Sequence, residues 1–145
     1  MNASADVLAV SQLIARYAEL VDAGDFAGVG TLFTGDSVFR GSGRPAVGGA
    51  GVEAMLNASV IRYEDGTPRT QHVTTTSAVE VDEDARGASA RSAVTVFQAL
   101  PDFPLQAVAA GRYEDRLVRR GGRWLFAERR VRIHLVGDVS HHLRG

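Results

Sequence analysis

The chain has 145 residues, 45% hydrophobic and 23% charged, with a formal net charge of -1. This composition predicts one globular domain spanning residues 1–145, with no basic field for nucleic acid or an anionic membrane. The absence of cysteine excludes disulfides and thiolate sites, and because all 16 basic residues are arginine, lysine Schiff-base chemistry is excluded too. We find neither a membrane-spanning apolar run nor a signal peptide, and expect a cytoplasmic protein.

The first half of the chain predicts three helices. Apolar residues recur every three or four positions from Val7 to Val21, which is the pattern of a helix with one buried stripe, and Gly24 can end it. Asp25 can cap a short second helix that reaches Phe33. The next segments predict a short strand, a glycine-rich loop and a third helix: Ser37–Arg40, Gly41–Gly51 and Val52–Tyr63.

After Pro68 the pattern changes to β-structure. Four long strands are predicted, separated by turns rich in Gly, Asp or Pro: Val73–Val81, Ala88–Leu100, Leu105–Val118 and Arg123–Leu135. Helices followed by antiparallel strands indicate an α+β fold. A twisted sheet of long strands can curl around the helices, and we expect a cone whose interior can hold a small ligand.

Three residues form the candidate catalytic group. His72 opens an apolar strand, and Tyr17 and Asp22 lie near the end of the first helix. A neutral imidazole, whose ordinary pKa is about 6.5, can take a proton from a carbon next to a carbonyl. Asp22 would orient the imidazole and Tyr17 would donate a hydrogen bond to the substrate. The alternative is that Tyr17 and His72 only pack in the core.

Helix geometry constrains this group. Tyr17 and Asp22 are five positions apart, about 140° around an ideal helix. Their side chains can therefore converge only across a wide cavity or at a helix that unwinds at its end.

Charged residues on the last two strands are further candidates. Strict alternation places Asp115 on the face of Tyr113 and Leu117, where a charge indicates a pocket ion pair. On the last strand it groups Trp124, Phe126, Glu128, Arg130 and Arg132. Of the adjacent Arg129 and Arg130, one is expected to be solvated and the other paired. A register slip of one residue would reverse these assignments.

His134, His141 and His142 lack carboxylates at metal-motif spacing. We therefore predict no metal site, and expect these histidines to belong to a tail at the mouth of the cavity.

Several segments together resemble a known family. They are Arg16–Asp25, Leu32–Asp36, Gly111–Asp115 and Gly122–Trp124, and they resemble the SnoaL-like branch of the nuclear-transport-factor-like superfamily. The resemblance covers nearly the whole chain. It implies a cystatin-like α+β barrel, in which a curved antiparallel sheet forms a cone around three N-terminal helices.

The resemblance also extends to catalytic positions. Tyr17, Asp22 and His72 match the spacing of the Tyr, Asp and His of bile-acid 7α-dehydratases, and Arg132 lies in a segment similar to the one holding their functional arginine. The segment ending at His72 is similar to that of scytalone dehydratases, although their second histidine has no counterpart on the following strand. More distantly, Tyr17 and Asp115 fall where ketosteroid isomerases hold two hydrogen-bond donors.

The resemblance implies a cofactor-independent enzyme with Tyr17, Asp22, His72 and Arg132 as catalytic residues. We expect a dehydratase acting on a hydrophobic polycyclic or polyketide-like hydroxy-carbonyl compound. The alternatives are an isomerase or cyclase with the same site, or a non-catalytic module for small-molecule binding or dimerisation. A homodimer is expected, with a trimer as the alternative. The residues expected to contact the substrate are Phe26, Phe39, Met55, Asp115 and Trp124.

Overall fold

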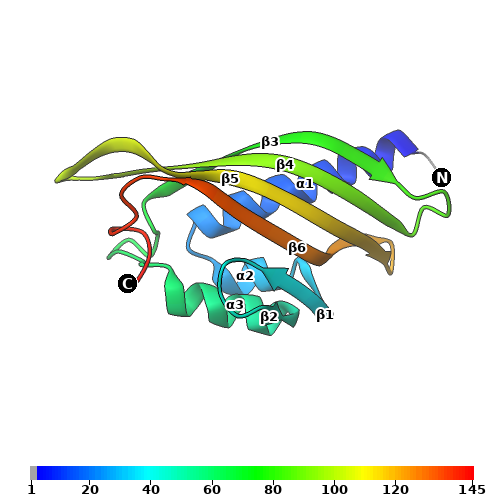
Figure 1. The fold of residues 1–145 in the computed structure, drawn as a ribbon. Coiled ribbons are helices and arrows are strands. Elements are labelled where there is room, and N and C mark those ends of the chain that lie inside the picture. The colour runs from blue at the N-terminus through cyan, green and yellow to red at the C-terminus, as the bar shows by residue number, and fades with distance from the viewer. Residues whose placement is uncertain (1–2) are drawn as a thin grey trace.

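The computed structural model describes residues 3–145, as three helices and a six-stranded sheet (Figure 1). In chain order the elements are α1 (Ala3–Asp22), α2 (Phe26–Gly30), β1 (Phe33–Arg40), β2 (Ala46–Val47), α3 (Gly48–Ser59), β3 (Thr70–Val81), β4 (Gly87–Leu100), β5 (Phe103–Arg120) and β6 (Arg123–Val136).

The strand order across the sheet is β2-β1-β6-β5-β4-β3. All neighbours are antiparallel except β1 and β6, which run parallel. The twisted sheet arches over α1 on one side, and α2, α3 and the short strands close the lower edge (Figure 1). The predicted α+β architecture, with a curved sheet around three N-terminal helices, is confirmed, and the parallel β1–β6 pair is an addition to it.

The segment predicted as a loop at residues 41–51 is partly structured. It contains β2, and α3 begins at Gly48 instead of Val52 and ends at Ser59. The reason is close packing: a Cβ on Gly49 would lie 2.2 Å from the Gly30 carbonyl oxygen. Two helices therefore meet through glycine backbone here, and the small residues that indicated a loop serve contact between α2 and α3.

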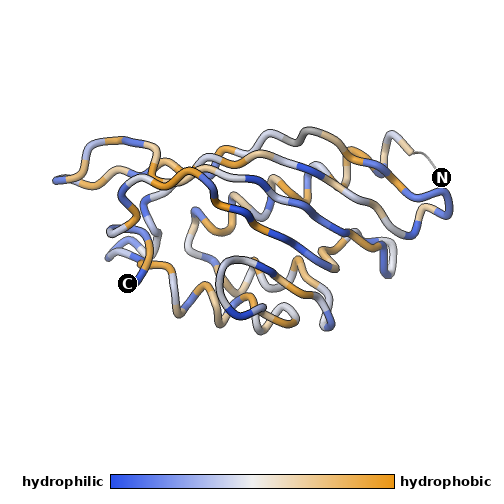
Figure 2. The backbone as a smooth tube through the Cα atoms, in the orientation of Figure 1, coloured by the Kyte–Doolittle hydropathy of each residue, from blue (hydrophilic) through white to orange (hydrophobic). Residues whose placement is uncertain are grey.

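The helices bury their apolar faces against the sheet. In α1 the buried stripe includes Val10, Ile14, Tyr17 and Val21, as the periodicity predicted. Polar residues gather along the middle of β5 and β6, while apolar residues recur along α1 and α3 (Figure 2). No helix within residues 3–145 has the length and apolar character needed to cross a membrane.

One irregularity in β6 decides which side chains point inward. Leu117 of β5 lies opposite Phe126, but its neighbour Arg116 lies opposite Glu128. The residue between Phe126 and Glu128 is therefore an extra one, which forms a β-bulge. The bulge resets the alternation, so that Phe126 and then Arg129 face the interior.

Candidate active site

His72 and Asp22 form a hydrogen-bonded pair where the end of α1 meets the start of β3. His72 Nδ1 lies 2.6 Å from Asp22 Oδ1, and the His72 backbone N–H donates to Asp22 Oδ2 at 2.8 Å. Thr70 Oγ1 donates to Oδ1 at 2.9 Å. Because a carboxylate only accepts, we assign the proton to His72 Nδ1, which leaves Nε2 with a free lone pair. This is the geometry of an oriented general base.

Local structure on both sides holds this pair. Asp22 ends α1, where the helix dipole disfavours an anion, and its hydrogen bonds offset that cost. Gly24 follows at φ +76°, and a Cβ there would lie 2.0 Å from the Gly66 carbonyl oxygen, so the chain turns tightly after the helix. Arg69, with a positive φ of 58°, turns the chain into β3 just before His72.

Tyr17 lies in the interior, five residues before Asp22 on α1. It is 5% exposed and packs edge-on against Tyr113 and Phe126, each at 6.1 Å between ring centroids. Burial raises the pKa of the Tyr17 phenol, while Arg129 opposes the rise and Asp22 adds to it. The phenol is therefore a hydrogen-bond donor at neutral pH, within electrostatic range of the Asp22 carboxylate.

Arg129 is a fully buried cation beside Tyr17. Its Nε and Nη2 bond to the two carboxylate oxygens of Asp115 at 2.9 and 3.2 Å. Its Nη1 has no hydrogen-bond partner among residues 3–145. The guanidinium carbon lies over three rings, at 4.3 Å from the centroid of Tyr17, 3.6 Å from Tyr113 and 4.7 Å from Phe126. This pairing agrees with the predicted pocket ion pair at Asp115.

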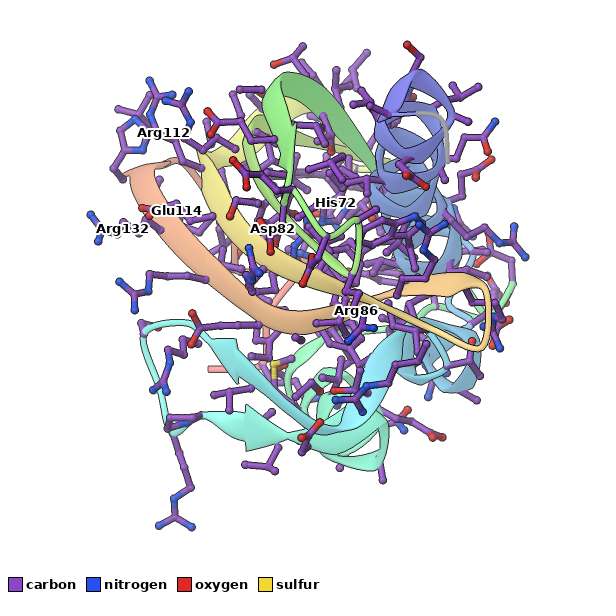
Figure 3. All side chains as sticks on the ribbon, turned by 90° about the vertical axis from the view of Figure 1, so that its right-hand side faces the viewer. His72, Asp82, Arg86, Arg112, Glu114 and Arg132 are labelled. Atoms are coloured by element: carbon purple, nitrogen blue, oxygen red, sulfur yellow. The ribbon has the colours of Figure 1, made fainter. Side chains whose placement is uncertain are left out.

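Arg132 is not brought to the site, contrary to its expected place there. Its side chain is 64% exposed and lies 3.7 Å from Glu114. Figure 3 shows Arg112, Glu114 and Arg132 projecting from the sheet away from α1, whereas His72 lies between the sheet and the helix. The bulge in β6 is the cause, and Arg129 is the strand arginine of the interior. The adjacent arginine pair in the sequence was the signal for it.

The residues expected to contact the substrate fall in different places. Phe39 belongs to the aromatic cluster through Phe33, at 6.2 Å between centroids. Phe26 is buried under the Arg62 guanidinium, and Met55 packs against the core from α3.

Trp124, which was expected to contact the substrate, lies far from the His72–Asp22 pair. Its Nε1 donates to Asp6 Oδ1 at 3.3 Å, in the first turn of α1 and thus at the opposite end of the helix from Asp22.

A second histidine lies against His72, supplied by the segment after β6 (residues 137–145). The ring of His142 lies 6.2 Å from that of His72, and the residue is 7% exposed. His141 instead packs against Phe103 at 4.3 Å, and His134 is exposed on β6. Within residues 3–145 no three His, Asp or Glu side chains converge as metal ligands would.

The interior of the cone is more filled than expected. The space among Tyr17, Phe33, Tyr113 and Phe126 is occupied by these rings and by the Arg129 guanidinium. Two hollows, of about 340 and 420 Å³, lie instead on the outer face of β4–β6 and beside the β5–β6 turn. The His72 side chain is 9% exposed, so access to it requires a covering group to move.

Comparison with known proteins establishes the family. The family model described as the SnoaL-like domain matches residues 2–130. The chain belongs to the SnoaL-like family. No curated protein sequence matches it significantly.

Solved structures similar to this SnoaL-like protein share its fold. A variant of Rv3472, a protein of unknown function from Mycobacterium tuberculosis, is 28% identical, with a TM-score of 0.73 over 89% of this chain and 72% of that one. A Catenulispora acidiphila protein in complex with S-DNPA is 30% identical, with a TM-score of 0.71 over 90% and 94% of the two chains. A provisionally named scytalone dehydratase from Novosphingobium aromaticivorans is 20% identical, with a TM-score of 0.72 over 92% and 87%.

Proposed function

We propose that this SnoaL-like protein is a cofactor-independent dehydratase for a hydrophobic polycyclic or polyketide-like hydroxy-carbonyl compound. The observation that carries the proposal is the largely buried His72–Asp22 pair, in which Asp22 holds Nδ1 and leaves His72 Nε2 as the base. Two buried donors, the Tyr17 phenol and the Arg129 Nη1, lie in the interior. A base and two oxyanion donors are what enolate chemistry requires.

In the proposed reaction His72 Nε2 removes the proton from the carbon between the carbonyl and the hydroxyl-bearing carbon. The electron pair of the broken C–H bond passes into an enolate, whose oxygen accepts hydrogen bonds from Tyr17 and Arg129. The enolate then forms the carbon–carbon double bond as the C–O bond breaks. The leaving hydroxide takes up a proton, either from the His72 imidazolium or from solvent, and departs as water. Asp22 stabilises the imidazolium formed at His72.

The test uses 3-hydroxy-1-tetralone as substrate. Its elimination product tautomerises to 1-naphthol, and the absorbance of 1-naphthol measures the rate. We expect His72→Ala to lower kcat by about 10²–10⁴-fold, the usual contribution of a general base. Asp22→Asn should lower it less, because the base remains but loses its orientation. Exposed His134→Ala is the matched control and should behave as wild type. Unchanged turnover in folded His72→Ala would reject the assignment.

Two alternatives have specific tests. An isomerase or cyclase would use the same residues for enolisation, and it would exchange the α-protons of 1-tetralone for deuterium from solvent in a His72-dependent manner, without eliminating 3-hydroxy-1-tetralone. The filled aromatic interior instead favours a non-catalytic dimerisation module. Such a module would neither bind these ketones nor show exchange or elimination.

A further inference from the structure

The segment after β6 folds back beneath the sheet and lies beside the chain that follows α3 (Figure 1). Gln98, which is fully buried on β4, donates to the His141 carbonyl at 3.0 Å, and the Tyr63 hydroxyl donates to the same oxygen. The His142 carbonyl accepts from the Ile61 backbone N–H at 2.9 Å. Hydrogen bonds thus hold the carbonyl groups of His141 and His142 in place. They fix the backbone that carries the His142 ring.

The His142 ring lies edge-to-face with the His72 ring, at 6.2 Å between centroids and 68° between planes. Its Nδ1 is buried and has no hydrogen-bond partner among the residues that the structure describes. A polar atom buried without a partner costs about 1–3 kcal/mol, so one placed beside a base calls for an explanation. The titratable groups that act on the ring are His72 and Asp22.

We propose that His142 is a substrate-contacting residue, whose Nδ1 hydrogen-bonds the hydroxyl group of the substrate beside His72. The proposal rests on the proposed function and adds a named contact to it.

A hydroxyl is the chemical group that fits this nitrogen. In neutral imidazole one ring nitrogen donates and the other accepts, and the tautomer decides which role Nδ1 takes. A hydroxyl both donates and accepts, so it satisfies Nδ1 in either tautomer, whereas a ketone oxygen satisfies only the donor form. Burial and His72 lower the pKa of His142 to about 4, so its ring is neutral at physiological pH. The contact is therefore between two neutral groups.

The test compares the binding of 2-tetralol with that of tetralin, which differ by one hydroxyl. Neither has a carbonyl to acidify a C–H bond, so neither reacts under the proposed mechanism. We expect wild type to bind 2-tetralol about tenfold more tightly, the ratio that one hydrogen bond of ordinary strength provides. The preference should vanish in His142→Phe, which keeps the ring shape. It should persist in part in His142→Asn, whose side-chain amide reaches the Nδ1 position.

Histidine-selective ¹⁵N NMR gives a second readout. Adding 2-tetralol should shift the His142 Nδ1 resonance and leave that of His134 unchanged. His134→Phe, at the exposed position on β6, is the matched control and should keep the hydroxyl preference. Equal affinities for the two probes in wild type and His142→Phe, including failure of both to bind, would overturn the assignment of His142.

The two proposals can fail separately. If wild type and His142→Phe show no hydroxyl preference while turnover depends on His72, the role of His142 alone is rejected. A preference that depends on His142, with turnover unaffected in His72→Ala, would reject the dehydratase mechanism alone.

Discussion

Asp115 and Arg129 face each other across β5 and β6, and neither side chain has any exposed surface. Their two hydrogen bonds compensate charges that would otherwise be very costly to bury. The pair also holds the Arg129 guanidinium against Tyr17, where it is proposed to hydrogen-bond the enolate oxygen. The proposed enolate site thus contains the counter-ion of its own arginine, and the contribution of the pair to stability can be measured by mutation.

We predict that Asp115→Ala destabilises the protein by about 3–5 kcal/mol, because it leaves Arg129 charged and unpaired in the core. Urea unfolding would measure the change. The control is Glu114→Ala, which removes the exposed partner of Arg132 at 3.7 Å and should cost less than about 1 kcal/mol. Similar values for the two variants would contradict this account of the buried pair.

His142 should give the protein a specific loss of stability in acid. Its pKa is about 4 when folded and about 6.5 when unfolded, so the unfolded chain binds the proton more tightly. The stability that neutral His142 contributes is complete above about pH 6.5 and is lost as the pH falls toward 4. We expect a loss on the order of 3 kcal/mol, from the difference in pKa.

The measurement is urea unfolding of wild type and His142→Phe between about pH 7 and 4.5. Subtracting the two curves removes the contribution of the carboxylates common to both proteins. The wild type should lose more stability than the variant over this range. Parallel curves would show that His142 titrates alike in the folded and unfolded chains.

At the scale of elements, the end of α1 and the bulge in β6 place the proposed catalytic residues. The helix end was readable, because Asp22 and Gly24 occupy recognisable positions at its terminus. The bulge could not be predicted from the sequence, because strict alternation assumes one residue on β6 for each residue on β5. That assumption grouped Arg132 with Trp124 and Phe126, which are buried, whereas the extra residue before Glu128 turns Arg129 inward.

Gly24→Ala tests whether the turn after α1 is required. At φ +76° an added Cβ would lie 2.0 Å from the Gly66 carbonyl oxygen, so both the conformation and the space oppose it. Gly121→Ala is a matched control, since Gly121 also has a positive φ but an added Cβ would meet nothing within 4 Å. We expect Gly121→Ala to lower the free energy of unfolding by about 1 kcal/mol, from conformational strain alone. Gly24→Ala should lower it by more.

Thermal or urea unfolding would compare the two glycine variants. Gly24→Ala should also weaken turnover of 3-hydroxy-1-tetralone, because displacement of the turn moves Asp22 away from His72. Equal stability losses in the two variants would show that contact with Gly66 is unimportant.

Across the whole molecule, the outer face of the sheet remains uncovered. It carries exposed ion pairs, including Arg40 with Glu128 and Arg116 with Asp82, and large apolar side chains are exposed near the ends of β5 and β6. Leu105, Leu135 and Val136 are 72%, 60% and 64% exposed. Charges of both signs beside apolar side chains are suited to contact with a second copy of the same face.

We therefore expect a homodimer through this face. Sedimentation should give twice the chain mass for wild type, and Leu135→Glu should shift the equilibrium toward monomer by placing a charge in the apolar part of the interface. His134→Glu, next along the strand, is the control for an added charge. A wild-type monomer at high protein concentration would contradict the expectation.

Sequence patterns predicted the fold class, the helices and the long strands, because hydrophobic period and turn residues are local properties. The Tyr17, Asp22 and His72 set was singled out by the chemistry of these residue types, and the family resemblance matched their spacing. What could not be read was long-range: the approach of His142 to His72, the filling of the cone by Arg129, and the use of Trp124 to anchor α1 through Asp6. Each depends on which distant segments meet, and neither spacing nor alternation contains that information.

The parallel pairing of β1 with β6 affects when the nascent chain can fold. Phe33 of β1 lies opposite Phe126 of β6, so β1 leaves the ribosome long before its main partner exists. Until then only the two-residue β2 can pair with it, and the apolar faces of α1 and α3 lack the sheet that covers them. The native structure can therefore close only after nearly the whole chain has been synthesised, so the nascent chain exposes apolar surface for most of its synthesis.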